Sequence, residues 1–228
     1  MTTFLEQGPS RQTYSGSSSS LSMPYTADTD NSVICLGMFW SPSSASISSI
    51  TSTGITWTSG FAKIVDSSFG VAYQAFYGVV SSVITPDAAV ISFSAAVTSW
   101  EGNTAEFSTN LTSPSWALVA GAGSHNDTNV STFTAAPLSL AVNDLYWCQF
   151  VDSAVGVYTP SSPLTGFTYL EPGNRPMAYG LNVPTATSYA PAFSTTVAAE
   201  YFSWALALRP SGGAPPLWVP PTTGMGFM

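Results

Sequence analysis

Hydrophobic and polar residues alternate in short runs along this chain, and no helix-length window keeps an apolar period of about 3.6 residues. In residues 89–97, Ile91 and Phe93 share one face of the pattern while serines occupy the other. Such alternation is typical of a half-buried strand. Residues 32–41 are almost entirely apolar and indicate a strand that is buried on both faces. The pattern therefore predicts short β-strands and no structural helix.

The last patterned run, residues 195–208, predicts a strand with two apolar faces. One face carries Phe202, Trp204, Leu206 and Leu208, and the other carries Tyr201, Ala205 and Ala207. Gly, Pro, Asn, Asp and Ser separate the runs, as turn residues do. The expected strands cover residues 15–25, 32–41, 47–59 with a bend at Thr53-Gly54, 61–65, 69–80, 89–97, 115–121, 145–152, 166–170, 177–183 and 195–208.

Many antiparallel strands at this spacing predict an all-β fold, an antiparallel β-sandwich of the jelly-roll type. We expect an N-terminal arm over residues 1–12, a sandwich domain over 13–210 and an extended, Pro-rich C-terminal tail over 211–228. Residues 103–107 and 135–143 could each hold one helical turn, which does not change the fold class.

The C-terminal tail combines stiff prolines with large apolar side chains. Its Pro-rich part should be extended in polyproline-like geometry, and a disordered linker would not carry so many apolar residues. We expect it to dock on a neighbouring subunit, with folding back on its own domain as the alternative. The residues expected to bind the partner are Leu217, Trp218, Val219, Met225, Phe227 and Met228.

Composition indicates a folded protein with an uncharged polar surface. Hydrophobic residues make up 45% and aromatic residues 13% of the chain, whereas charged residues make up only 7%. Ordinary soluble domains carry about 25% charged residues. The exposed faces must therefore be built from Ser, Thr, Asn and Gly, and such a surface suits packing against copies or partners.

The charge balance excludes nucleic acid as a partner. The net charge is −8 and the pI is near 4.1, and the basic residues do not cluster; they are Arg11, Lys63, Arg175 and Arg209. Nucleic-acid binding needs several basic residues along one track, so we expect none. The N-terminus lacks a signal-peptide pattern, and no apolar run reaches the ~20 residues of a spanning helix. We therefore expect the protein to be made in the cytoplasm and not to insert into a membrane.

No catalytic constellation emerges from the sequence, and we expect no catalytic residue. A Ser–His–Asp triad would have to use His125, which lies in a polar segment without a nucleophile elbow. A glycosidase-like pair of carboxylates is the more serious enzymatic alternative, although no spacing forces two acids together. The candidates for that pair are Asp66, Glu101, Glu106, Asp152, Glu171 and Glu200.

Metal and cofactor chemistry is not expected either. His125 is the only histidine, and zinc prefers around four ligands. The oxygen donors of Asp28-Thr29-Asp30-Asn31 resemble the start of a calcium loop, but the later Gly and Glu are missing, so a plain turn explains them. Cys35 and Cys148 lie in apolar segments and are expected to be buried thiols, with a disulfide as the alternative.

Exposed aromatic rings are the usual means by which a β-sandwich stacks on sugars. The best candidates lie near expected turns, although rings of this kind more often belong to the core. They are Trp57, Trp100, Trp116 and Tyr189.

Three segments resemble the β-sandwich domains of minor tail, fibre and tip proteins of tailed bacteriophages. Residues 50–57 resemble their strand–Gly–strand hairpin, with Ser-Thr-Gly where many of them have an Asp-x-x-Gly-Asn turn. Residues 75–80 followed by 90–94 are similar to their aromatic strand and the alternating strand after it, and residues 204–210 to their closing strand.

The resemblance covers about residues 13–210 and implies a multi-copy virion structural protein without catalysis or cofactor. Its implied partners are copies of itself and other virion proteins, in the tail or on the capsid. The alternative is a carbohydrate-binding module that attaches to a host cell-surface glycan.

Overall fold

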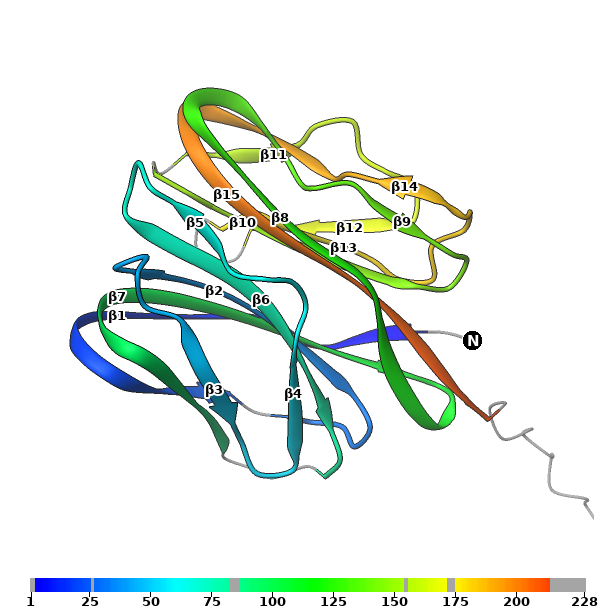
Figure 1. The fold of residues 1–228 in the computed structure, drawn as a ribbon. Helices are drawn as coiled ribbons and strands as arrows, with labels where there is room; N and C mark the ends of the chain where they lie inside the picture. Colours follow the sequence, from blue (N-terminus) through cyan, green and yellow to red (C-terminus); the bar gives the residue numbers. More distant parts are fainter. Residues whose placement is uncertain (1–2, 26, 83–86, 154–155, 172–174, 214–228) are drawn as a thin grey trace, which may run out of the picture.

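The structure is a computed structural model that describes residues 3–25, 27–82, 87–153, 156–171 and 175–213. Every regular element in these ranges is a β-strand, and all pairs between these strands are antiparallel. The all-β, sandwich-like prediction is therefore confirmed (Figure 1). The described ranges also hold no helix that is long and apolar enough to cross a membrane.

The N-terminal half forms one seven-stranded sheet, here sheet A. Its order is β1-β7-β2-β6-β4, with β3 paired to β7 and β5 paired to β6. The strands are β1 (Thr3–Tyr25), β2 (Val33–Ser41), β3 (Ile47–Thr51), β4 (Ile55–Ser59), β5 (Ile64–Asp66), β6 (Val71–Val80) and β7 (Asp87–Thr109). The bend expected at Thr53-Gly54 separates β3 from β4, and Gly54 has a positive φ of 70° there.

The C-terminal half forms a six-stranded sheet B with the order β11-β15-β10-β13-β12 and β8 paired to β15, together with a two-stranded sheet of β9 and β14. The strands are β8 (Thr112–Thr134), β9 (Leu138–Leu140), β10 (Leu145–Asp152), β11 (Tyr158–Pro160), β12 (Phe167–Leu170), β13 (Met177–Gly180), β14 (Thr187–Tyr189) and β15 (Ala192–Gly213).

The two halves repeat one strand arrangement. Counted within sheet A and within sheet B, a long first strand pairs with a long last strand, which pairs with the second strand of that sheet, which pairs with its penultimate strand. The repeat extends to single residues. Gly78 of β6 pairs with the second residue of β2, and Gly180 of β13 pairs with the second residue of β10. A Cβ on either glycine would press on an aromatic ring of the next strand, Trp57 or Phe167 respectively.

Three hydrophobic clusters fill the molecule. The central one lies between sheets A and B, and contains Cys35, Phe107 and Trp147. A second lies inside the N-terminal half and contains Trp40, and a third lies inside the C-terminal half and contains Phe150. The middle strands are therefore covered on both faces, as expected for residues 32–41. The face assignment of β15 is also confirmed, because its two sets of residues pack into the central and C-terminal clusters respectively.

Several expectations need correction. Residues 103–107 belong to β7 and residues 138–140 to β9, so neither expected helical turn exists. Strand β1 starts at Thr3 and β15 continues to Gly213, so neither expected domain boundary separates two elements. The expectation for the two cysteines is confirmed, because Cys35 and Cys148 are both buried and free, in different clusters.

Candidate functional site

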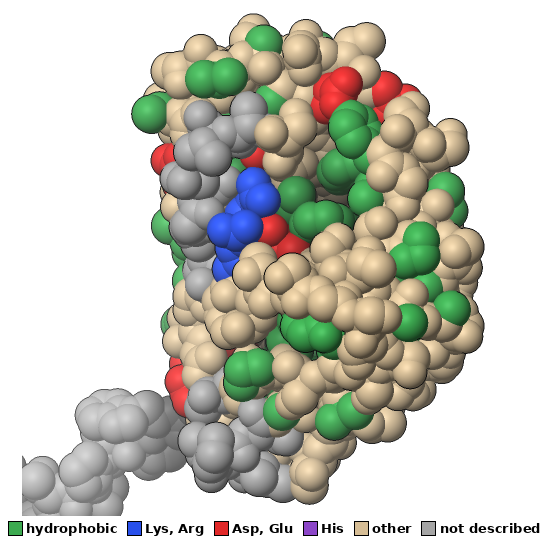
Figure 2. Space-filling view, turned by 90° about the vertical axis from the view of Figure 1, so that its left-hand side faces the viewer, with side chains coloured by type: hydrophobic (Ala, Val, Ile, Leu, Met, Phe, Trp, Pro, Cys, Tyr) green, Lys and Arg blue, Asp and Glu red, His purple; other side chains and the backbone are tan. Residues whose placement is uncertain are grey.

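A cleft opens where the two sheets meet, and we call it the inter-sheet cleft. It has a volume of about 170 Å³ and combines apolar walls with charged side chains. It is lined by Phe39, Phe69, Val71, Val151, Asp152, Ser153, Arg175, Glu200 and Phe202. Figure 2 shows a hollow on this side of the molecule, with hydrophobic walls, acidic side chains at its base and basic side chains beside it.

Arg175 is the centre of an ion-pair network at the cleft. Its Nε and Nη2 donate to the two oxygens of Glu101 at 2.8 and 3.1 Å, and its Nη1 donates to Oδ1 of Asp152 at 3.1 Å. Arg11 donates a further bond to Glu101 at 2.8 Å. Glu101 belongs to sheet A and Asp152 to sheet B. One guanidinium therefore ties the two sheets together through charge-assisted hydrogen bonds.

The pKa values of the two carboxylates in this network are shifted in opposite directions. Burial would raise the pKa of Glu101, but the hydrogen bonds from Arg175 and Arg11 outweigh it and the pKa is lowered. Burial raises the pKa of Asp152 above its ordinary value despite a hydrogen bond from Tyr158 and the charge of Arg175. The side chains of Glu101 and Asp152 are only 3% and 1% exposed. Their oxygens already accept bonds from protein donors, which suits a structural role better than proton transfer.

Of the other acids that were candidates for a glycosidase pair, only Glu200 lines the cleft within the part of the chain that the structure describes. It shares the cleft with Asp152, and Glu171 is exposed at the end of β12. Glu106 is buried and accepts bonds from the Ser32 hydroxyl and from the N–H groups of Asp28 and Thr29. The segment that resembled a calcium loop is thus a turn whose amides are bound by Glu106.

Comparison of the chain with protein-family models, with curated proteins and with solved structures finds no match. The resemblance to phage tail and fibre proteins therefore stays a prediction.

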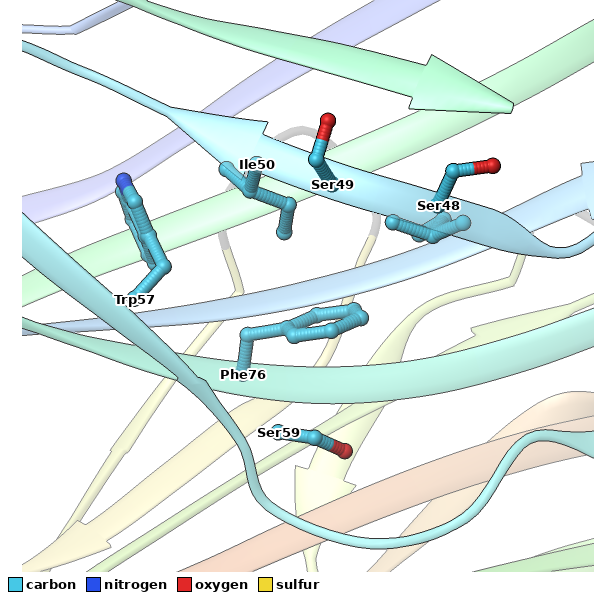
Figure 3. A pocket seen from close by; sticks show the side chains of 7 residues that line it. Ser48, Ser49, Ile50, Trp57, Ser59 and Phe76 are labelled. Atoms are coloured by element: carbon cyan, nitrogen blue, oxygen red, sulfur yellow. The ribbon is translucent and has the colours of Figure 1, made fainter. Parts of the chain in front are cut away.

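A second hollow, the Trp57 groove, lies between β3 and β4. It has a volume of about 260 Å³ and is lined by Ile47, Ser48, Ser49, Ile50, Trp57, Ser59 and Phe76. Figure 3 shows Trp57 of β4, Ile50 of β3 and Phe76 of β6 around it. The indole of Trp57 is half-buried, donates its N–H to the Ser52 hydroxyl at 2.8 Å and meets the ring of Tyr25 edge-on.

The other three aromatic candidates are buried, which corrects their assignment as stacking residues. Trp100 is 5% exposed, and Trp116 and Tyr189 are each 7% exposed. They belong to three different clusters, so they form no common surface. Of the four rings, only Trp57 has a face that a ligand could reach.

The six apolar tail residues from Leu217 to Met228 lie outside the described residues, so their expected role in docking remains a prediction.

The sequence did not predict the role of Arg175. The available signal was the scarcity of basic residues. Because the chain has only four of them, each is a candidate partner for several buried acids.

Proposed function

We propose that this protein is a structural component of a tailed-phage virion, in the tail, a fibre or on the capsid, that acts by assembly and surface binding and not by catalysis. The observation that carries the proposal is the pair of long edge strands, β1 and β8. Each has 23 residues, and among the described residues each pairs with a strand on one side only, β7 or β15.

These edges carry few of the charged residues that commonly block pairing with another chain, although Pro9, Pro24, Pro114 and several register shifts interrupt them. Proteins commonly block exposed edges with charged residues, especially lysine, or with very short strands. Strand β1 contains only Glu6 and Arg11 as charged residues, and β8 contains only Asp127 beside His125. Between Ser10 and Met23, β1 also has no proline. Edges of this kind favour strand addition from a neighbouring subunit, with backbone hydrogen bonds supplying the affinity.

The repeated strand arrangement supports the same proposal. The order first–last–second–penultimate within each sheet, with last strands β7 and β15 that also pair at their other ends with the shorter strands β3 and β11, fits two jelly rolls in tandem. Jelly rolls are common in viral capsid proteins and in lectins. The jelly-roll arrangement is an analogy of fold.

We propose further that residues 211–228 act as an extended, Pro-rich strap that docks on a neighbouring subunit or another virion protein. This role rests on the sequence of the tail. Its starting point needs adjusting, because Ser211 and Gly213 pair with Ser115 and Thr112. A truncation that spares the fold should end at Gly213.

The test is the solution mass of the full chain and of the chain ending at Gly213, measured by light scattering over a range of concentrations. The account predicts a defined oligomer of the 23.8 kDa chain. An oligomer that survives truncation assigns assembly to the edges, and one lost on truncation assigns it to the strap. A full chain that stays monomeric at every concentration contradicts the proposal.

A carbohydrate-binding function is the second candidate, and the Trp57 groove favours it. Three serine hydroxyls surround a groove with a half-buried indole, a combination of apolar and hydrogen-bonding groups that suits a neutral sugar. Calorimetric titration with neutral oligosaccharides tests it. Trp57→Phe should weaken binding and Trp100→Phe, at a buried ring, should not. Equal affinities for the two variants, or no binding to the parent chain, would rule the groove out.

A further inference from the structure

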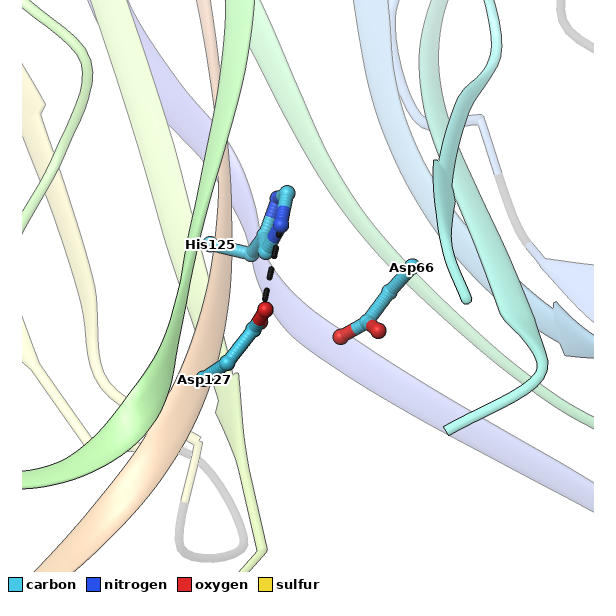
Figure 4. Close-up of side chains that lie close together, drawn as sticks. All are labelled: Asp66, His125 and Asp127. Atoms are coloured by element: carbon cyan, nitrogen blue, oxygen red, sulfur yellow. Dashed lines mark ion pairs between the residues drawn. The ribbon is translucent and has the colours of Figure 1, made fainter. Parts of the chain in front are cut away.

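Three side chains with metal-binding atoms converge from the two halves of the molecule. Asp66 ends β5 of sheet A, whereas His125 and Asp127 lie on β8 of sheet B. Their nearest ligand atoms all lie within 4.8 Å of one another. Figure 4 shows the carboxylates of Asp66 and Asp127 directed toward the same space, with the imidazole of His125 beside them.

Asp66 provides the independent sign that something binds there. The residue is only 2% exposed. Its Oδ1 accepts the N–H groups of Ser68 and Phe69 at 2.7 and 3.2 Å, but its Oδ2 is buried and has no hydrogen-bond partner among the described residues. A buried carboxylate oxygen without a donor or a cation is costly. Among the described residues, none of the ion pairs involves Asp66.

The local structure of β8 brings its two donors to the same side. His125 and Asp127 are two residues apart, and alternate residues of a strand share a face. The register with β15 slips just beyond Asn126, which pairs with Tyr201, before Val130 pairs with Ala199. Such bulges re-aim side chains. Nε2 of His125 lies 3.5 Å from Oδ1 of Asp127.

The imidazole of His125 is already oriented for ligation. Its Nδ1 lies 3.1 Å from the hydroxyl of Tyr73, a residue that is fully buried. The rings of Tyr73 and Phe202 flank it at centroid distances of 6.1 and 6.5 Å. Metal-bound histidines generally donate their other ring N–H to such a partner, which fixes the tautomer. With Nδ1–H donated to Tyr73, the lone pair of Nε2 faces the carboxylates.

We infer that Asp66, His125 and Asp127 form a binding site for a divalent transition-metal ion of the Zn²⁺ type, which joins β5 of one half to β8 of the other. Two carboxylates and one neutral imidazole balance the charge of a divalent cation. Zinc ligands at about 2.1 Å from the metal in tetrahedral geometry lie about 3.4 Å apart, close to the His125–Asp127 separation. Asp127, with a side chain 46% exposed, has room to close the remaining gap.

The donor set also decides against the other common cations. Calcium takes six to eight oxygen ligands, and magnesium is usually held by carboxylates and water without imidazole. An imidazole nitrogen beside two carboxylates suits zinc, manganese or iron. Since the site uses three protein ligands and its open side faces solvent, water completes the coordination. The inference is independent of virion assembly, because it concerns a link within one chain.

The experiment uses the full chain without a histidine tag. Because His125 is the only histidine, the imidazole C–H signals in the proton NMR spectrum belong to it alone. Titration with ZnCl₂ should shift these signals with saturation at one equivalent and should raise the thermal unfolding midpoint. Asp66→Asn keeps the Oδ1 acceptor of the turn but loses the charge, and should weaken zinc binding at least about tenfold. Asp127→Asn should do the same.

Asp30→Asn is the matched control, since it removes a carboxylate from the turn at residues 28–31 and should leave zinc binding unchanged. Circular dichroism of each variant without metal establishes that the fold is retained. Three results would overturn the site: no shift of the His125 signals in excess zinc, parental affinity in Asp66→Asn, or displacement of zinc by an equal concentration of Ca²⁺. Zinc binding lost in Asp30→Asn would equally place the ion elsewhere.

Discussion

Gly37 of β2 lies directly beneath the indole of Trp204 of β15, across the central cluster. A Cβ added at Gly37 would lie 1.9 Å from Nε1 and 2.0 Å from Cε2 of that ring. Trp204 is fully buried. The two sheets therefore approach so closely at this point that only a residue without a side chain fits, and the inter-sheet distance depends on this pair.

Gly37→Ala should destabilise the fold by about 1–3 kcal/mol or more, because a close-packed interior has to move to admit the methyl group. Gly8→Ala is the matched control, since nothing lies within 4 Å of a Cβ at Gly8, and it should be neutral. Denaturant unfolding followed by tryptophan fluorescence measures both. In a Trp204→Phe background, Gly37→Ala should lower the free energy of unfolding by a smaller amount. An equal loss in both backgrounds would argue against a direct contact between Gly37 and Trp204.

Replacing Arg175 with Met should be the most damaging single change at the inter-sheet cleft. It leaves the buried Glu101 and Asp152 without their shared partner, and breaking a buried pair in this way costs about 3–5 kcal/mol. Arg11→Met should cost about 1 kcal/mol or less, because its side chain is 35% exposed and Glu101 keeps both bonds from Arg175. Equal losses in urea unfolding would contradict the central role of Arg175.

Two buried glutamates should shape the acid dependence of stability in opposite ways. The lowered pKa of Glu101 means that the folded state releases this proton more readily, so its contribution is lost as pH falls below 4.5 through the folded-state value. Burial raises the pKa of Glu106, so its contribution is present below 4.5 and is lost as pH rises through the folded-state value. Glu106→Gln should remove the loss of stability that occurs as pH rises through the folded-state pKa of Glu106. Glu101→Gln should remove the loss of stability that occurs as pH falls below 4.5. Urea midpoints measured across the acidic range test this, and parallel profiles for the two variants would refute it.

Gln149 is a polar residue in an apolar setting. It is fully buried, and neither atom of its amide has a hydrogen-bond partner among the described residues. Gln149→Met keeps the shape of the side chain and removes the unpaired groups, so it should be neutral or stabilise the protein by up to about 1–3 kcal/mol. Gln74→Met is the control, because Gln74 donates to Ser59 and Phe61, and it should destabilise. A clear loss of stability in Gln149→Met would show that its amide is satisfied after all.

Strands whose own pattern matches their burial could be predicted from the sequence. Strand β10 covers the expected residues 145–152, and the two faces of β15 pack as its alternation indicates. In contrast, residues 103–107 favour a helical turn locally but are held in β7 between β1 and β2. Residues 124–134 look like a loop because they are small and polar, and they form a strand because β15 pairs with them.

The candidate sites could not be predicted because they join residues that are distant in the chain. Arg175 meets Glu101, and Asp66 meets His125, only because the two halves pack sheet against sheet. The repeat of the halves was equally hidden, since what they share at equivalent positions is as little as Tyr-Gly at residues 77–78 and 179–180. Pairing order, and not residue identity, carries the repeat.

The edge strand β1 offers the most direct test of assembly by strand addition. Ser17 and Ser19 are exposed on this strand, and lysines there should block pairing with a second chain. Ser49→Lys/Thr51→Lys adds the same charge on β3, an exposed strand already paired with β7 and bridged to β4. The measurement is the light-scattering mass of the two double variants and of the parent chain. The account predicts that Ser17→Lys/Ser19→Lys lowers the mass while the β3 variant keeps that of the parent. An unchanged oligomer in the β1 variant, with its fold intact, would contradict assembly through this edge.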